Sequence, residues 1–145
     1  MNEGKPRTIR NIPIRVTAAL IVREGKALLC RRAAGQKLSG YWEFPGGKVE
    51  DGESDIECLE RELFEELDIV SEAGSVVAEN IHQYDGFPVH LVLLETKIVS
   101  GTLAPTVHDR IEWVSVESLL DWKLAPADIL LAVEVTNLFS SGNIK

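Results

Sequence analysis

The chain has 145 residues, 45% of them hydrophobic and 26% charged, with a formal net charge of −8 at pH 7. This length suits one domain with a substantial core, and we expect a single domain over residues 1–145. No apolar run reaches the roughly 18–20 residues that a membrane-spanning helix needs, so we expect no membrane contact. The acidic charge argues against a nucleic-acid polymer as partner but permits a small phosphorylated substrate.

The first residues of the chain are polar. Residues 1–11 carry three basic side chains and predict a flexible arm, with no apolar segment of the kind found in signal peptides. Cys30 and Cys58 lack metal-ligand spacing and are interpreted as buried thiols in a reducing, cytoplasmic environment. A monomer and a homodimer are both compatible with the sequence.

Apolar and β-branched runs separated by turn signals predict strands, and longer periodic segments predict helices. The predicted strands cover residues 14–22, 27–32, 75–84, 88–98 and 111–115, with a short one just before Pro45. Asp85-Gly86 joins two of them as a hairpin turn. The predicted helices cover residues 54–67, 116–122 and about 127–139, the last with apolar residues Ile129, Leu130, Val133 and Leu138. These elements suggest an α/β fold in α/β/α layers, with a helix on each side of a mixed sheet.

The helix over residues 54–67 is strongly encoded. Ser54 and Glu57 form a capping box at its start. Its apolar residues fall on one stripe, which we expect to be buried, at Ile56, Leu59, Leu63 and Leu67.

Three glutamates crowd one face of this helix. Glu62, Glu65 and Glu66 lie within about 100° of one another, beside the apolar stripe. Repulsion between Glu62 and Glu66, which are four residues apart, destabilises an isolated helix by roughly 0.2–0.5 kcal/mol. The negative end of the helix dipole also opposes all three glutamates. A solvated acidic face is the ordinary interpretation, but Arg61 is the only basic residue in the helix. The pattern therefore indicates a missing cation, and Mg²⁺ prefers such oxygen ligands.

The spacing of Gly47, Glu53 and the segment 61–69 resembles the Nudix box, GX5EX7REUXEEXGU, where U is aliphatic. One position departs, because Asp68 stands where the pattern has glycine. We expect this residue to form a left-handed helix C-cap, which aspartate tolerates better than most residues.

The resemblance implies a fold and a metal site. The fold would be the Nudix-type α/β/α sandwich with a central mixed β-sheet. The Gly47 carbonyl and Glu62, Glu65 and Glu66 would bind Mg²⁺, with Mn²⁺ as a substitute. One of the three glutamates would also act as general base, and a Glu53–Arg61 pair would orient the carboxylates, which requires Glu53 to fold back onto the helix.

Segments outside the box resemble the MutT-type and CTP pyrophosphohydrolase-type branch of this family. LLCRR implies Arg32 as a phosphate contact, with Arg31 a weaker candidate, ahead of a loop over residues 33–40 that can act as a lid. WEFPGGK supplies Phe44 and Lys48 as candidate substrate-binding residues, and LAPADI places Asp128 at the base-contacting position.

Two further points are left open by the residues around these segments. Relatives carry a glutamate where this chain has Val107, so Asp109 and Glu112 become the candidate helper acids. His82 and Tyr84 are candidates to face the nucleotide, but the sequence does not give their side of the sheet.

The implied reaction is hydrolysis of a nucleoside triphosphate to the monophosphate and pyrophosphate. The base is left open, because 8-oxo-dGTP, CTP or dCTP and methylated cytosine nucleotides are all compatible. The alternatives are a Nudix hydrolase of another diphosphate, such as ADP-ribose or a dinucleoside polyphosphate, and a nucleotide-binding module without turnover.

Overall fold

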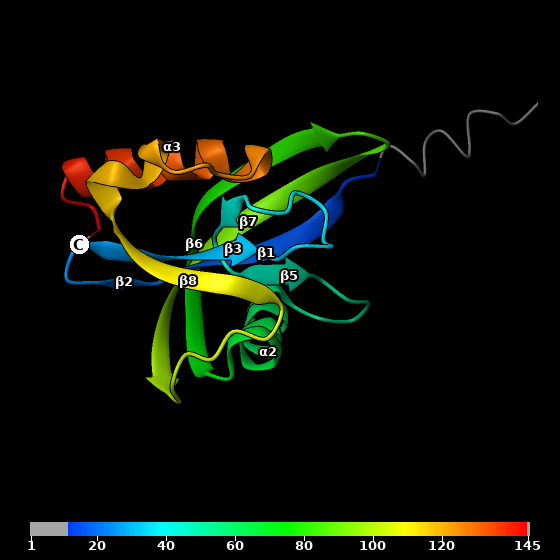
Figure 1. The fold of residues 1–145 in the computed structure, drawn as a ribbon, viewed down its shortest axis with the longest axis horizontal. Coiled ribbons are helices and arrows are strands. Elements are labelled where there is room, and N and C mark those ends of the chain that lie inside the picture. Colours follow the sequence, from blue (N-terminus) through cyan, green and yellow to red (C-terminus); the bar gives the residue numbers. More distant parts are fainter. Residues whose placement is uncertain (1–11, 145) are drawn as a thin grey trace, which may run out of the picture.

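The computed structural model describes residues 12–144, so the predicted arm over residues 1–11 lies outside the described part of the chain. Figure 1 shows the arrangement of its elements. The strands are β1 (Ile14–Leu20), β2 (Val22–Arg23), β3 (Lys26–Arg32), β4 (Trp42–Glu43), β5 (Gly46–Lys48), β6 (Val70–Tyr84), β7 (Phe87–Ser100) and β8 (His108–Ser115). The helices are α2 (Asp55–Leu67), the 3₁₀ helix η1 (Val116–Asp121) and α3 (Pro126–Ser140).

The strands form two sheets. The first has the order β5-β1-β7-β6, and it is mixed because β1 and β7 run parallel while the other neighbours are antiparallel. In the second, β3 pairs antiparallel with β2, β4 and β8. The long β6–β7 hairpin turns at Asp85-Gly86, where the chain was predicted to turn, and Gly86 takes a left-handed φ of 88°.

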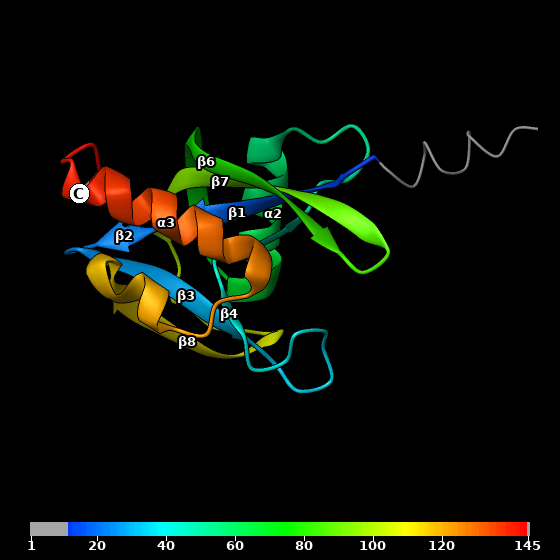
Figure 2. The same cartoon turned by 90° about the horizontal axis from the view of Figure 1, so that it is seen from above.

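The two long helices cover opposite faces of the sheets, with α3 above the strands and α2 below them in Figure 1 and the same layers seen from α3 in Figure 2. Alternate residues of β1 explain this layering, because a strand points successive side chains to opposite faces. Ala18 and Leu20 join the core under α3, whereas Ala19 and, directly after the strand, Ile21 join the core under α2. The prediction of α/β/α layers around a mixed sheet is confirmed.

Both caps of α2 form as predicted. The Glu57 N–H donates to Ser54 Oγ at 3.1 Å, and the Ser54 N–H donates to Glu57 Oε1 at 2.9 Å. Asp68 takes the left-handed conformation at φ 59° and ψ 37°, and its N–H donates to the Phe64 carbonyl. Aspartate therefore closes this helix in the conformation for which the family pattern uses glycine.

The predicted buried stripe of α2 is wrong at its first position. Leu59, Leu63 and Leu67 are fully buried, but Ile56 is 43% exposed and Cys58 is buried instead. A polar contact rather than apolar packing holds the first turn, since Asp55 accepts two hydrogen bonds from Arg15 of β1.

The C-terminal helix also buries a different face from the one expected. Ile129 and Leu130 are 44% and 57% exposed. The buried positions are mostly small, at Ala127, Asp128, Leu131, Ala132 and Val135. A search for large apolar residues overlooks such small buried positions.

Both cysteines are buried thiols, as predicted. Within residues 12–144, the helices are too short or too polar to cross a membrane.

Candidate active site

The glycines of β5 allow two elements to approach closely. A Cβ at Gly47 would overlap the carboxylate of Glu62 on α2, and a Cβ at Gly46 would overlap the Thr17 carbonyl of β1. The Gly47 carbonyl accepts from the Thr17 hydroxyl at 3.4 Å and from the Cys58 thiol at 3.5 Å. The box glycine is therefore required here by the carboxylate that packs against it.

Arg61 is the centre of the charged face of α2. Its Nε donates to Glu53 Oε2 at 2.6 Å and its Nη2 donates to Glu53 Oε1 at 3.0 Å. Its Nη1 donates to Glu62 at 3.2 Å and to Glu65 at 3.1 Å. Glu53 does fold back onto the helix, as predicted. The hydrogen bonds from Arg61 lower the pKa of Glu53 to about 2, and those to Glu53 raise the pKa of Arg61.

Glu66 is the carboxylate that lacks such compensation. It is half-buried, and burial followed by the neighbouring charge of Glu62 raises its pKa to about 8. The sequence predicted a deficit of positive charge on this face, and the structure locates it at Glu66.

The donors on this face fit a hard divalent cation. They are a backbone carbonyl and three carboxylates, the ligand types that Mg²⁺ and Mn²⁺ accept. Within residues 12–144, no three acidic, histidine or cysteine side chains already converge on one point. Arg61 holds Glu62 and Glu65, so sharing an ion with Glu66 requires these carboxylates to rotate.

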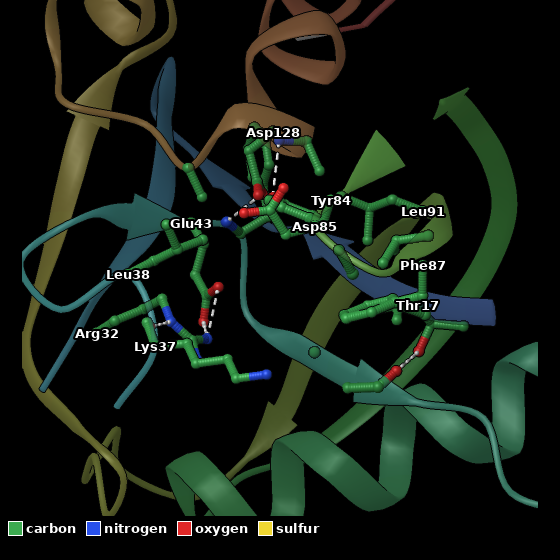
Figure 3. Close-up of a pocket in the computed structure, with 18 residues that line it drawn as sticks. Thr17, Arg32, Lys37, Leu38, Glu43, Tyr84, Asp85, Phe87, Leu91 and Asp128 are labelled. Carbon is green, nitrogen blue, oxygen red and sulfur yellow. Dashed lines mark hydrogen bonds and ion pairs between the residues drawn. The ribbon is translucent and has the colours of Figure 1, made fainter. Parts of the chain in front are cut away.

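A pocket of about 580 Å³ lies between β5, whose Gly47 packs against this face, and the start of α3. Figure 3 shows α2 below it, Asp128 and Tyr84 at its far end, and Arg32, Lys37 and Glu43 on one wall. Its apolar lining includes Val16, Phe44, Phe87, Val89 and Leu91. The volume and the few polar groups suit a nucleotide-sized ligand.

Asp128 closes the far end of the pocket. Asp128 is 4% exposed. Its Oδ1 accepts a hydrogen bond from the Phe44 backbone N–H at 3.1 Å. Burial, followed by the charge of Glu43, raises its pKa well above the usual range. Burial therefore favours the neutral acid, which can both donate and accept, more than it is favoured in an exposed aspartate.

Tyr84 ties the hairpin to the start of α3. Its hydroxyl oxygen accepts from the Ala127 N–H at 3.0 Å, while Asn80 donates to the Ala127 carbonyl at 3.1 Å. The structure thus settles the side of the sheet for Tyr84, which lines the pocket. His82 stacks edge-on against Tyr84 at 4.5 Å between ring centroids and does not line it.

The two adjacent arginines of β3 point to different places. Arg32 lines the pocket and donates from Nη1 to both oxygens of Glu43, at 3.1 and 3.2 Å. Arg31 pairs with Asp109 at 2.7 Å and lies over Trp42, outside the pocket. The structure therefore brings Arg32, and not Arg31, to the cavity.

The remaining candidates divide in the same way. Phe44 lines the pocket, whereas the Lys48 side chain is exposed and outside its lining. Asp109 pairs with Arg31, and Glu112 accepts from Arg110 at 2.8 Å. Lys37 and Leu38, from the loop expected to act as a lid, border the cavity.

Sequence reasoning missed Glu43 and His108. Glu43 lines the pocket, and His108 Nε2 lies 2.9 Å from its Oε2. Their contact spans 65 residues of sequence, so no local pattern signals it.

Comparisons with known proteins agree with this geometry. The NUDIX domain family model matches residues 13–132. The CTP pyrophosphohydrolase of Escherichia coli K12 is 44% identical over 118 residues, 81% of this chain and 87% of the relative. A putative 8-oxo-dGTP diphosphatase 2 of Mycobacterium tuberculosis is 34% identical over 116 residues, 78% of this chain and 81% of the relative.

A solved structure shares the fold. The solution structure of the E. coli ORF135 protein superposes with a TM-score of 0.81 at 39% identity, covering 93% of this chain and 96% of that one. The chain belongs to the Nudix family and is a hydrolase of that family. Members of this family generally use divalent metal ions.

Proposed function

We propose that this protein hydrolyses a nucleoside triphosphate to the monophosphate and pyrophosphate with Mg²⁺. The observation that carries the proposal is the contact between Gly47 and Glu62, because Gly47 also lines a nucleotide-sized pocket and so brings the acidic face of α2 next to one end of it. The buried carboxyl of Asp128 lies at the other end. A triphosphate and a base can therefore be bound at opposite ends of one cavity.

Each group of residues has a distinct role at the phosphate end. The Gly47 carbonyl, Glu62, Glu65 and Glu66 would hold the ion, which supplies Lewis-acid activation of water and neutralisation of phosphate charge when bound. One of the glutamates takes the proton of the attacking water. Arg61 and Glu53 keep the carboxylates oriented.

Arg32 faces the substrate from the pocket wall. Arg32 lines the pocket, and its positive charge offsets a small part of the rise in the pKa of Glu66. A positioned donor of this kind stabilises charge that develops on phosphate oxygens, an effect of about 3–4 kcal/mol in other enzymes.

At the base end, Asp128 in its neutral form would match cytosine. It offers an acceptor to the exocyclic amine and a donor to ring N3, a pair of complementary hydrogen bonds. The name of the E. coli relative supports this choice, so we propose CTP or dCTP, including methylated cytosine, as the preferred substrate class. Oxidised guanine is the second candidate, because the M. tuberculosis relative is named for 8-oxo-dGTP.

A substrate panel tests the proposal. CTP, dCTP, 5-methyl-dCTP, 8-oxo-dGTP, ADP-ribose and a dinucleoside polyphosphate are each incubated with Mg²⁺ or Mn²⁺, and products are separated by ion-exchange chromatography. We expect the highest kcat/KM for a cytosine triphosphate. Preferred cleavage of ADP-ribose or the dinucleotide would contradict the triphosphate assignment, and tight CTP binding without any product would indicate a binding module.

A further inference from the structure

His108 is a buried side chain behind the pocket wall with no role in the reaction described above. Its side chain is 2% exposed, and it does not line the cavity. Its Nε2 lies 2.9 Å from Glu43 Oε2, while its Nδ1 has no hydrogen-bond partner among residues 12–144. A buried N–H without an acceptor is unfavourable, so the hydrogen belongs on Nε2, which donates to Glu43.

A β-bulge places this histidine. β3 and β8 pair Arg31 with Arg110, and then Arg32 with His108, so the register skips Asp109. Bulges re-aim the side chains beside them. As a result His108 lies opposite Arg32, on the strand next to it, and both side chains reach the Glu43 carboxylate.

Glu43 in turn fixes the guanidinium of Arg32. Both carboxylate oxygens accept from Nη1, and the Lys37 carbonyl accepts from Nε. Within residues 12–144 the hydrogen bonds of Arg32 leave Nη2 without an acceptor. Because Arg32 lines the pocket, its Nη2 is available to a ligand there. The hydrogen bonds of Nε and Nη1 hold the rest of the guanidinium in place.

We propose that His108 is a positioning residue that acts through Glu43 to hold Arg32 with Nη2 ready for a substrate phosphate. The inference rests on the proposed function, because it assumes that Arg32 meets a triphosphate. The alternative is that His108 only stabilises the packing of β3 against β4 and β8. The positioning role predicts that the effect of His108 on nucleotide binding requires Arg32, whereas the packing role predicts that it does not.

Two amide substitutions form a matched pair. In His108→Gln the amide nitrogen reaches the position of Nε2, whereas in His108→Asn it reaches only the position of Nδ1. Affinity for CTP is measured by calorimetry in EDTA, where turnover is blocked, and KM and kcat are measured with Mg²⁺. Thermal unfolding monitors folding of each variant, and His108→Met, which is similar in length without a donor, supplies a second comparison with His108→Gln.

We expect His108→Asn and His108→Met to raise Kd and KM for CTP about tenfold with a smaller effect on kcat, and His108→Gln to stay within about threefold of wild type. In an Arg32→Ala background, His108→Asn should weaken binding no further, since its route to the substrate is gone. Equal losses for the asparagine and glutamine variants, or a full additional loss in the Arg32→Ala background, would overturn the assignment. Absence of CTP binding by wild-type protein would instead sink the proposed function.

Discussion

Glu53 and Arg61 are joined by two hydrogen bonds, of 2.6 and 3.0 Å, although seven residues, including the start of α2, separate them. The pair is possible because Glu53 precedes the helix cap and folds back along it. The same guanidinium contacts Glu62 and Glu65. One arginine therefore relieves most of the repulsion on the acidic face and leaves Glu66 as the group that needs a further positive charge.

Arg61→Ala should impair metal use more than folding. Without the guanidinium, Glu62 and Glu65 lose their orientation, and loss of such supporting contacts lowers metal affinity or activity by about 10–100-fold. The Mg²⁺ concentration for half-maximal rate should rise in a titration at saturating CTP. Arg110→Ala is the control, since Arg110 pairs with Glu112 outside the pocket and should leave the titration unchanged. Equal Mg²⁺ curves for both variants would refute the role of Arg61.

Gly47→Ala should disable the site by sterics alone. The new methyl group would occupy the space of the Glu62 carboxylate and force it to move. A misplacement of about 1 Å can reduce turnover by about a hundredfold. Gly74→Ala is the matched control, because a Cβ there meets only the Glu95 carbonyl at an ordinary 3.6 Å. If Gly47→Ala turned over substrate at nearly the rate of Gly74→Ala, the contact between Gly47 and Glu62 would not be needed for activity.

Glu66→Gln should separate stability from activity through pH. Folding raises the pKa of Glu66 from 4.5 to about 8, so between these pH values the folded chain holds a proton that the unfolded chain releases. The free energy of unfolding of the wild type therefore decreases, through Glu66, as the pH rises from about 4.5 to about 8. In EDTA, the variant should be more stable than wild type at pH 8, with the difference shrinking toward pH 5.

Solvent limits the size of that effect. Because Glu66 is only half-buried, we expect a difference of about 1–2 kcal/mol at pH 8 in urea unfolding, well below the full shift. Mg²⁺-dependent turnover should be abolished in the same variant. A wild-type stability that rises between pH 5 and 8 relative to the variant would have the wrong sign.

Asp128→Ala should change selectivity. The substitution removes the paired donor and acceptor at the base end, so kcat/KM for the best triphosphate should fall about 10–100-fold, with a smaller loss on the poorest substrate. It also leaves the buried Phe44 N–H without its acceptor, which costs about 1–3 kcal/mol of stability. Equal losses across the nucleotide panel, after correction for folded fraction, would contradict base recognition by Asp128.

Local patterns predicted the parts of this structure that depend on neighbours in sequence. The capping box of Ser54 and Glu57, the left-handed Asp68 and the Asp85-Gly86 turn are set by a few adjacent residues. The grouping of Glu62, Glu65 and Glu66 follows from helix geometry. These features are readable because the responsible contacts span four residues or fewer.

Contacts across the fold were not readable in the same way. His108 meets Glu43 over 65 residues, and a bulge that no local pattern announces sets its position. Ile56 and Leu130 have the apolar character of core residues, yet they lie on helix faces that the packed fold leaves exposed. Tertiary geometry decides such cases.

The most direct test is phosphorus NMR of CTP incubated with Mg²⁺ and the wild-type protein, with Glu66→Gln in parallel. Wild type should release CMP and pyrophosphate in equal amounts, and the variant should leave CTP intact. Release of CDP and orthophosphate, or equal turnover by the variant, would contradict a pyrophosphate-releasing centre built on Gly47 and the glutamates of α2.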